Sequence, residues 1–243
     1  MLESELFFRK LKPAEGFYNS EVQSPQSWPV RTFLPTGYEP GYAYPLLVFF
    51  HGYGSDEKQI MHLAPRLSRR NFICIGLRGP QAVGVRSDGE VGYAWGADDG
   101  FDVQLEEYVF QAIDMTCETY NIHSDRIYLA GFCEGASLAY RLGLTFPEKI
   151  AGIISLNGAM TRHNRPLLRL PDIRKLRIFI GHGIANALMP LSLAKSDHKL
   201  LYTAGLNVNW QTYLTNHRLH PDMLRDINRW VIDHCNENYS VDS

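Results

Sequence analysis

The chain has 243 residues, of which 45% are hydrophobic and 21% charged, with a formal net charge of −2. Its pI near 6.5 argues against binding to nucleic acid or to an anionic membrane surface, because no excess of positive charge is present. No stretch approaches the roughly 18 consecutive apolar residues of a membrane span, and the N-terminus has no signal-peptide pattern. We expect a soluble, cytoplasmic protein.

Short apolar runs typical of buried strands alternate along the chain with helical patterns. The predicted strands cover residues 30–34, 46–50, 72–76, 127–130, 150–156, 176–180 and 208–213. The predicted helices, with apolar residues spaced by three or four, cover residues 57–70, 103–120, 136–146, 191–204 and 221–234. This alternation predicts an α/β fold with a mostly parallel central sheet and helices on both of its faces.

The domain organisation predicted from this pattern is simple. Residues 1–28 form an N-terminal lead-in, either irregular or an edge hairpin, and residues 29–243 form one domain. Only about twenty residues separate the strands 150–156 and 176–180, so we expect no large lid domain there. Ligands of such sheets bind beyond the carboxyl ends of the strands, which directs attention to the loops that follow strands.

A glycine-flanked cysteine marks one of these loops. The sequence Gly131-Phe-Cys133-Glu-Gly135 follows a predicted strand and begins a helix. This G-x-C-x-G spacing in a strand–turn–helix context is typical of a nucleophile elbow. The helix N-terminus favours an anionic sulfur there. The alternative is a helix-start turn whose buried cysteine acts only as a small apolar residue.

A second glycine-rich turn, His51-Gly-Tyr53-Gly54, follows the most apolar strand. Glycines let this backbone turn inward, so the N–H of Tyr53 can face a developing oxyanion. The N–H of Glu134, directly after the nucleophile, is the expected second donor. Taken alone, the motif is equally compatible with an ordinary turn.

A general base and an orienting residue complete the predicted site. His217 lies between the strand 208–213 and the last helix, and is the preferred base; His182 and His220 are weaker rivals. The polar residue placed to hold the His217 ring is Asn186, with Asp197 as an alternative. His217 and His220 form an H-x-x-H pair without an evident third ligand, so we expect no metal. The four cysteines (Cys74, Cys117, Cys133 and Cys235) form no C-x-x-C pair, which also disfavours a zinc site or a disulfide framework.

With these motifs in order, the chain resembles the phospholipase/carboxylesterase branch of the α/β-hydrolases, which includes acyl-protein thioesterase-like enzymes. The resemblance runs from about residue 30 to 231, through HGYGSDE, the tryptophan loop, the elbow, HGIANALMP and NHRLHPDMLRDINRWV. It implies the α/β-hydrolase fold, with the nucleophile at Cys133, the acid position at Asn186 and the base at His217. The implied oxyanion donors are Tyr53 and Glu134, and no cofactor is implied.

Two positions depart from the family pattern, which typically reads G-x-S-x-G and HGxxD. Here the serine is replaced by Cys133 and the aspartate by Asn186. The two changes are compatible, since a thiolate–imidazolium pair can form before substrate arrives and an asparagine suffices to orient the ring, as in Cys-His-Asn proteases. The cysteine elbow alone is also similar to that of dienelactone hydrolases, which keep an acidic third residue.

The leading hypothesis is therefore an acyl hydrolase that acts through Cys133, His217 and Asn186 on a small or medium ester, thioester or lactone. The main alternative is a catalytically silent hydrolase fold that binds a ligand or a protein partner. A third is redox or metal-linked use of Cys133. The loop of residues 77–100 is expected to wall the pocket with Tyr93 and Trp95, although a surface loop with one packed tryptophan fits equally well. The sequence leaves a homodimer open.

Overall fold

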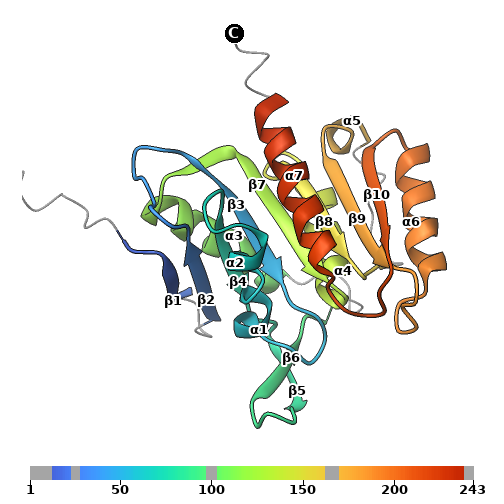
Figure 1. Ribbon diagram of the computed structural model, residues 1–243, viewed down its shortest axis with the longest axis horizontal. Helices are drawn as coiled ribbons and strands as arrows, with labels where there is room; N and C mark the ends of the chain where they lie inside the picture. Colours follow the sequence, from blue (N-terminus) through green and yellow to red (C-terminus); the bar gives the residue numbers. More distant parts are fainter. Residues whose placement is uncertain (1–12, 23–27, 97–102, 162–169, 238–243) are drawn as a thin grey trace, which may run out of the picture.

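An eight-stranded sheet forms the centre of the molecule (Figure 1). The structure, a computed structural model, describes residues 13–22, 28–96, 103–161 and 170–237. In spatial order the strands are β1 (Gly16–Val22), β2 (Trp28–Leu34), β4 (Ile73–Leu77), β3 (Tyr44–Phe50), β7 (Ile122–Phe132), β8 (Gly152–Leu156), β9 (Arg177–Gly183) and β10 (Asn207–Tyr213).

Most of the sheet is parallel, as the sequence predicts. Strand β2 pairs antiparallel with β1 and with β4, and every pairing from β4 through β3 to β10 is parallel. The carboxyl ends of β3, β7, β8, β9 and β10 therefore meet at one edge. The loops that follow β3, β7, β9 and β10 contain Tyr53, Cys133, Asn186 and His217, respectively.

Helices cover both faces of the sheet (Figure 1). One face packs against the helices α3 (Val103–Thr119), α4 (Glu134–Thr145), α5 (Leu170–Ile173) and α6 (Leu191–Thr203). The other packs against the helices α1 (Glu57–Met61), α2 (Ala64–Leu67) and α7 (Pro221–Glu237). The described residues contain no separate lid domain.

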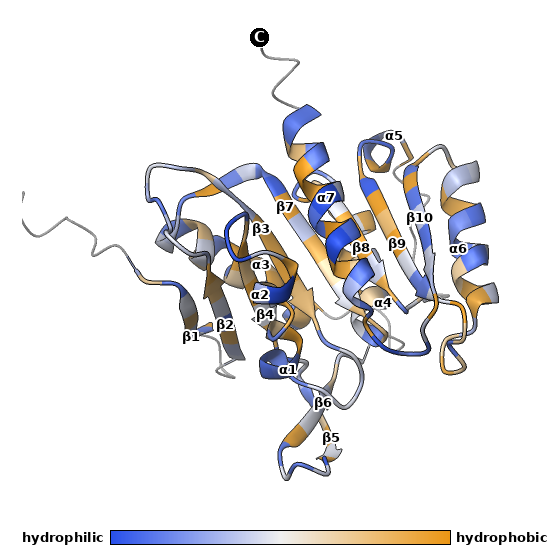
Figure 2. Ribbon diagram, viewed as in Figure 1, coloured by the Kyte–Doolittle hydropathy of each residue, from blue (hydrophilic) through white to orange (hydrophobic). Residues whose placement is uncertain are grey.

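Strand β3 points its side chains alternately to the two faces of the sheet, and this shows why the arrangement is stable. All seven of its residues are buried, with Leu46, Val48 and Phe50 in the core on one face and Leu47 and Phe49 in the core on the other. Such a strand is removed from water on both faces. The burial of each large apolar side chain stabilises the fold by roughly 1.5–3 kcal/mol. Figure 2 shows the same pattern across the sheet, with hydrophobic strands inside more hydrophilic helices.

Three features differ from the sequence-based expectation. The helix predicted over residues 57–70 is two short helices, because Pro65 lies in the first turn of α2 and cannot continue α1. The helix predicted from residue 136 begins at Glu134, directly after the cysteine. The segment 77–100 contains a two-stranded hairpin, β5 (Gln81–Val85) with β6 (Val91–Ala94), where a loop was expected; residues 97–100 lie outside the described ones.

The N-terminal lead-in contributes a strand to the sheet. Residues 1–12 and 23–27 lie outside the described residues, but β1 pairs along its whole length with β2, from Gly16 with Leu34 to Val22 with Trp28. The boundary expected between residues 28 and 29 thus falls at the start of β2. We propose that residues 16–22 be counted with the main domain.

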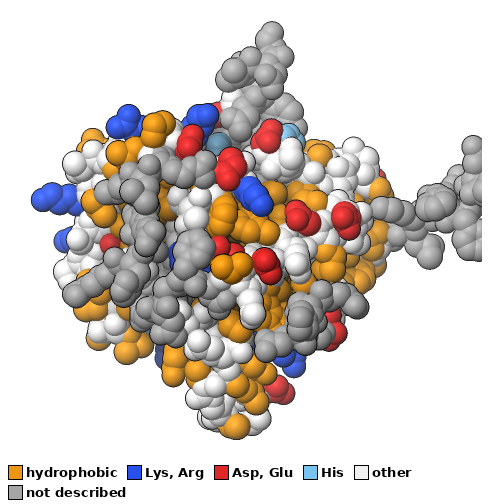
Figure 3. Space-filling model, turned by 180° about the vertical axis from the view of Figure 1, so that it is seen from behind, with side chains coloured by type: hydrophobic (Ala, Val, Ile, Leu, Met, Phe, Trp, Pro, Cys, Tyr) orange, Lys and Arg blue, Asp and Glu red, His pale blue; other side chains and the backbone are white. Residues whose placement is uncertain are grey.

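The surface carries some exposed apolar side chains. Figure 3, which shows the face behind that of Figure 1, has hydrophobic side chains at its lower end, where the β5–β6 hairpin projects. Val85 and Val91 in this hairpin are 73% and 37% exposed. None of the helices within the described ranges is both long and apolar enough to cross a membrane.

Candidate active site

Cys133 occupies a strained turn between β7 and α4. Its φ of 56° and ψ of −119° lie in a region that side chains rarely adopt, and such strain is characteristic of functional positions. The flanking glycines are sterically required. A Cβ on Gly131 would lie 2.1 Å from the carbonyl oxygen of Gly135, and one on Gly135 would lie 2.3 Å from that of Phe50. The elbow predicted from the G-x-C-x-G spacing is therefore present.

The turn after β3 lies directly against the elbow. A Cβ added to Gly52 would be 3.1 Å from the Cβ of Cys133, so only glycine lets the two loops approach this closely. The backbone N–H groups of Tyr53 and Glu134 both lie close enough to the Cys133 thiol to lower its pKa. The two predicted oxyanion donors thus lie beside the Cys133 sulfur, while the Tyr53 side chain itself is 67% exposed.

His51 holds this turn from inside the protein. Its fully buried ring bonds through Nδ1 to the Gly52 carbonyl at 2.8 Å and accepts the N–H of Gly79 at Nε2 at 2.9 Å. These contacts fix the tautomer, with the proton on Nδ1. Burial lowers the pKa of His51 to about 4, so the ring is neutral at physiological pH.

Trp95 does not line a pocket, contrary to expectation. Its indole is only 1% exposed, packs against Phe50 and His51, and donates from Nε1 to the His51 carbonyl at 2.8 Å. The reading of residues 77–100 as a surface loop with one packed tryptophan is closer to the structure. Trp95 therefore supports the oxyanion turn and is not presented to a substrate.

Tyr93 braces the same turn through its backbone. Its carbonyl accepts the N–H of Gly54 at 2.9 Å and its N–H donates to Ser55 at 2.8 Å, so β6 adds a short antiparallel bridge to the turn. The half-buried Tyr93 ring lies beneath the guanidinium of Arg78, 4.8 Å from its centroid. The structure gives Tyr93 a bracing contact; its predicted contact with substrate stays a prediction.

The carboxylate of Glu134 interacts with this support as well. Its Oε1 accepts the backbone N–H of Trp95 at 3.1 Å. The negative charge of Glu134 raises the pKa of Cys133, but less than burial does. The carboxylate beside Cys133 is thus tied to the neighbouring loop.

His217 and Asn186 meet as predicted. Nδ1 of His217 lies 3.0 Å from Oδ1 of Asn186, which also accepts the N–H of Met189 at 3.0 Å. An amide oxygen accepts, so the proton resides on Nδ1 and Nε2 is the basic nitrogen. The His217 ring packs against that of Phe132, centroid to centroid 4.9 Å, which places it beside the elbow. Within the described residues no hydrogen bond joins His217 to the Cys133 sulfur.

Burial favours the neutral forms of the Cys133 thiol and the His217 imidazole, so their pKa shifts give no support to a preformed ion pair. Burial raises the pKa of Cys133 above its ordinary value, outweighing the two backbone N–H groups that lower it. Burial, and then the neighbouring His182, lowers the pKa of His217. Both shifts oppose proton transfer from sulfur to imidazole before substrate binds.

The rival residues have other partners. His182 is buried and bonds through Nε2 to the Met189 carbonyl at 2.8 Å, and His220 accepts the N–H of Asp222 at 3.2 Å. Asp197 accepts the N–H of Met160 at 2.8 Å, and burial raises its pKa to about 6. Across the described ranges no group of three or more His, Cys, Asp or Glu side chains is arranged to hold a metal ion.

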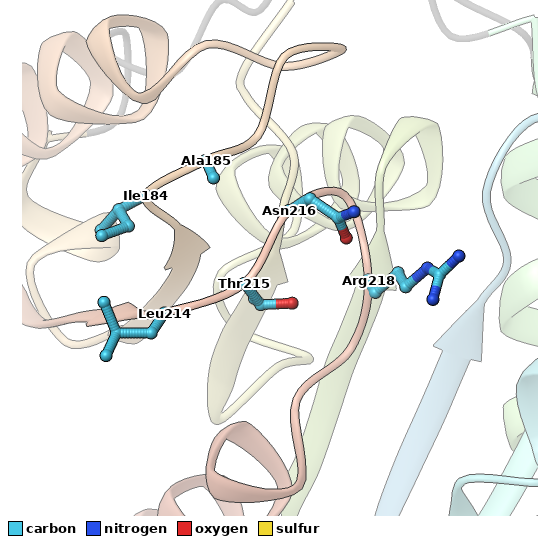
Figure 4. A pocket seen from close by; sticks show the side chains of 6 residues that line it. All are labelled: Ile184, Ala185, Leu214, Thr215, Asn216 and Arg218. Atoms are coloured by element: carbon cyan, nitrogen blue, oxygen red, sulfur yellow. The ribbon is translucent and has the colours of Figure 1, made fainter.

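An open hollow of about 520 Å³ borders the loops that carry Asn186 and His217 (Figure 4). It is lined by Ile184, Ala185, Leu214, Thr215, Asn216 and Arg218. Ile184 and Leu214 are 47% and 87% exposed, and in the figure they point away from the side chains of Asn216 and Arg218. The hollow therefore lies beside the site, and neither Cys133 nor Tyr53 belongs to its lining.

Comparison with known families agrees with this geometry. The sequence pattern of the phospholipase/carboxylesterase family matches residues 41–235, which is most of the chain. The chain belongs to the phospholipase/carboxylesterase family. The resemblance inferred from the motifs is confirmed, and with it the expectation of a hydrolase class that acts on ester or thioester bonds.

Acyl-protein thioesterases from two fungi are similar to the chain in sequence. Acyl-protein thioesterase 1 of Neurospora crassa is 34% identical over 95 residues, 38% of this chain and 39% of that protein. The Gibberella zeae protein of the same name is 24% identical over 181 residues, 72% of this chain and 76% of that one.

Solved structures confirm the α/β-hydrolase fold. A carboxylesterase from Mesorhizobium loti superimposes with a TM-score of 0.69 at 18% identity, covering 88% of this chain and 98% of that one. Acyl-protein thioesterase 2 of Zea mays superimposes with a TM-score of 0.63 at 16% identity, covering 84% of this chain and 98% of that one.

Proposed function

We propose that this family member is an acyl hydrolase with Cys133 as nucleophile, His217 as general base and Asn186 as the residue that orients the base. The observation that carries the proposal is the convergence of the Tyr53 and Glu134 N–H groups on the Cys133 thiol. Two backbone donors that converge beside a nucleophile are what a tetrahedral oxyanion requires. The substrate class is a small or medium carboxylic ester, thioester or lactone.

The proposed reaction has two halves. As the Cys133 sulfur attacks the carbonyl carbon, His217 Nε2 takes the thiol proton, and the carbonyl oxygen, now an oxyanion, accepts the N–H groups of Tyr53 and Glu134. The intermediate collapses to an acyl-cysteine while His217 protonates the leaving alcohol or thiol. His217 then deprotonates a water molecule, which attacks the acyl-cysteine and releases the carboxylic acid and the free thiol.

Asn186 orients the His217 ring and does not supply a charge to stabilise its protonated form. Its Oδ1 accepts from His217 Nδ1 at 3.0 Å, which keeps Nε2 free of a proton and available as a base. Because the resting thiol is neutral, the proton moves only during attack, when the developing charge is placed on the substrate oxygen and compensated by two N–H groups. An uncharged orienting residue suffices for a cysteine, whose proton is far more acidic than that of serine.

Apolar side chains around the site support an apolar acyl or aryl group on the substrate. Leu188, two residues after Asn186, is 73% exposed, and Ile184 and Leu214 are exposed on the neighbouring loops. The relatives from Neurospora crassa and Gibberella zeae are acyl-protein thioesterases by name, which agrees with a substrate that carries an acyl chain. Exposed apolar groups beside a catalytic residue gain favourable burial when such a chain binds.

One observation favours the alternative, a hydrolase fold that binds a ligand without turnover. Burial favours the neutral forms of both the thiol and the imidazole, and the third residue bears no charge. A site that has lost catalysis would tolerate the same changes.

Acylation by an activated ester separates the two functions. We expect the reduced protein to release nitrophenolate from p-nitrophenyl acetate in a burst, and intact mass spectra to show one acetyl group on Cys133, because the elbow presents this sulfur to the oxyanion donors. Cys133→Ala serves as the blank, and peptide mapping distinguishes Cys133 from the half-buried Cys117. An acetyl group only on other residues, or a burst unchanged in Cys133→Ala, contradicts the proposal.

The pH dependence of kcat/KM reports the state of His217. The base must be neutral, and burial lowers its pKa, so kcat/KM is expected to rise with pH below about 6.5, the ordinary imidazole value, and to level off at neutral pH. The measurement is a profile of p-nitrophenyl ester hydrolysis between about pH 4.5 and 8. A preformed thiolate–imidazolium pair would instead give an acid limb set by the thiol, well below the ordinary imidazole pKa, and a fall in kcat/KM at alkaline pH as the imidazolium loses its proton.

A further inference from the structure

The loops that carry the orienting residue and the base are in close contact. The N–H of Ala185 donates to the carbonyl of Thr215 at 3.1 Å, and a Cβ on Gly183 would lie 2.4 Å from the Asn216 carbonyl oxygen. Figure 4 shows the two loops side by side. The Ala185 bond fixes the chain on the N-terminal side of His217, and a separate contact is needed on the C-terminal side.

Asn157 provides that contact from a third strand end. It directly follows β8, is fully buried, and has a φ of 51°, in the left-handed region that asparagine adopts more readily than most residues. Its own N–H donates to the Gly181 carbonyl in β9 at 2.9 Å. The backbone of Asn157 is thus tied to the strand that leads to Asn186.

The Asn157 side chain then joins both loops. Its Oδ1 accepts the N–H of Gly183 at 2.8 Å, and its Nδ2 donates to the carbonyl of Arg218 at 2.9 Å. Gly183 lies three residues before Asn186, and Arg218 directly follows His217. Only a side chain that carries both an acceptor and a donor satisfies the two backbone groups at once.

The same segment also supports the nucleophile. Gly158 follows Asn157, and a Cβ there would lie 2.4 Å from the carbonyl oxygen of Cys133. The N–H of Cys133 in turn donates to Leu156 at 3.0 Å. The turn after β8 is therefore packed against the elbow while its amide holds the loop of the base.

We propose that Asn157 is a positioning residue that sets the place of His217 relative to Cys133 and Asn186. The expected effect of Asn157 on the reaction rate rests on the proposed function. Its effect on the position of His217 does not depend on turnover. Asn157 touches no reacting atom. It acts because the Arg218 carbonyl, one residue from the base, is bonded to a rigid amide anchored beside the elbow, and small displacements of a base lower the rate strongly.

The substitution that tests this is Asn157→Asp. The carboxylate keeps the acceptor for Gly183 but places an oxygen against the Arg218 carbonyl oxygen, so the loop of His217 is pushed away. At about pH 8 we expect kcat to fall at least about tenfold with KM within about twofold, as expected for a lost positioning effect. Burial raises the pKa of such a carboxyl, and its protonated form can again donate to Arg218, so the deficit shrinks as the pH is lowered.

Asn121→Asp is the matched control, because Asn121 also donates from Nδ2 to a backbone carbonyl, that of Pro40, but far along the sheet from the site. We expect it to leave kcat unchanged at every pH. Asn157→Gly, which accepts the positive φ and loses both bonds, should show the deficit without recovery at low pH. A kcat of Asn157→Asp within about twofold of the parent, a deficit independent of pH, or an effect confined to KM overturns the inference.

NMR of nitrogen-labelled histidine tests the positioning role of Asn157 separately from the proposed acyl hydrolase function. In the parent protein the His217 Nδ1–H bonded to Asn186 should give a protected, downfield proton signal, absent from a His217→Gln reference. We expect Asn157→Asp and Asn157→Gly to weaken or shift it, and Asn121→Asp to leave it in place. If the parent shows no turnover that depends on Cys133, the proposed function fails, whereas a signal unchanged in both Asn157 variants refutes the positioning role.

Discussion

Cys133→Ser is expected to lower the acylation rate about 10³–10⁴-fold, and Asn186→Asp on that background to restore most of the loss. A serine hydroxyl gives up its proton only at attack to a ring that then carries a full positive charge. Asn186 can orient that ring but cannot stabilise its charge, and amide-for-carboxylate exchange in serine triads costs about 10⁴ in rate. The loss corresponds to about 4–5 kcal/mol of transition-state stabilisation.

The measurement is a set of four proteins compared in single-turnover acylation: the parent, each single variant and the pair. With the parent cysteine, Asn186→Asp should change the rate much less than it does with serine, and it should move the acid limb of kcat/KM to higher pH, because a carboxylate raises the pKa of His217. The two positions should therefore be strongly non-additive. If the effects of Cys133→Ser and Asn186→Asp were additive, the role of Asn186 would not depend on which residue gives its proton to His217.

The buried amide of Asn186 makes the exchange structurally feasible. Its Nδ2 is buried and has no hydrogen-bond partner within the described residues, whereas Oδ1 has two donors, His217 and Met189. A carboxylate has the same shape, keeps both donors and removes the unpaired N–H group, which costs about 1–3 kcal/mol when buried. Near-parental thermal unfolding of Asn186→Asp is the check that the exchange leaves the fold intact.

Gly135→Ala is expected to abolish most of the activity, with a loss of about 10²–10³-fold. The new Cβ would lie 2.3 Å from the Phe50 carbonyl oxygen and 2.6 Å from that of His51, so it pushes the end of β3 and the oxyanion turn away from Cys133. These are backbone atoms and cannot rotate aside. We expect stability to fall by about 1–3 kcal/mol, the usual range for overpacking, as measured by urea unfolding.

Gly143→Ala is the matched control on the same helix. Its Cβ would lie 2.6 Å from the Ile153 side chain, which can change rotamer, and alanine is favoured over glycine in a helix by about 1 kcal/mol. Activity should therefore remain within about twofold of the parent. Equal losses in the two variants would mean that α4 tolerates no added methyl group, and the argument from the oxyanion turn would fail.

Features fixed by short-range sterics could be predicted from the sequence. Gly131 and Gly135 flank the nucleophile because any side chain there would collide with backbone, and this constraint is visible as a five-residue pattern. The parallel sheet followed from continuous apolar strands such as β3. The family and the fold are confirmed, whereas the roles of Cys133, His217 and Asn186 stay predictions.

Features that depend on distant contacts could not be predicted. Asn157 after a strand is indistinguishable from an ordinary turn asparagine, because its partners Gly183 and Arg218 lie 26 and 61 residues further along the chain. Trp95 in a glycine-rich loop suggested a pocket wall, since nothing local indicates that its indole bonds to His51. The raised pKa of Cys133 arises from its burial in the folded protein, which no local pattern encodes.

The raised pKa of the Cys133 thiol has a consequence for how long the cysteine stays unmodified. Peroxides and electrophilic metabolites attack thiolates far faster than thiols, so a low-pKa nucleophile is readily lost to sulfenic acid or adducts. Because burial raises the pKa of Cys133, we expect the sulfur to be activated only while a substrate carbonyl and His217 are both in place. Under the proposed mechanism, Cys133 is thus expected to react with the bound ester and to resist oxidation between turnovers.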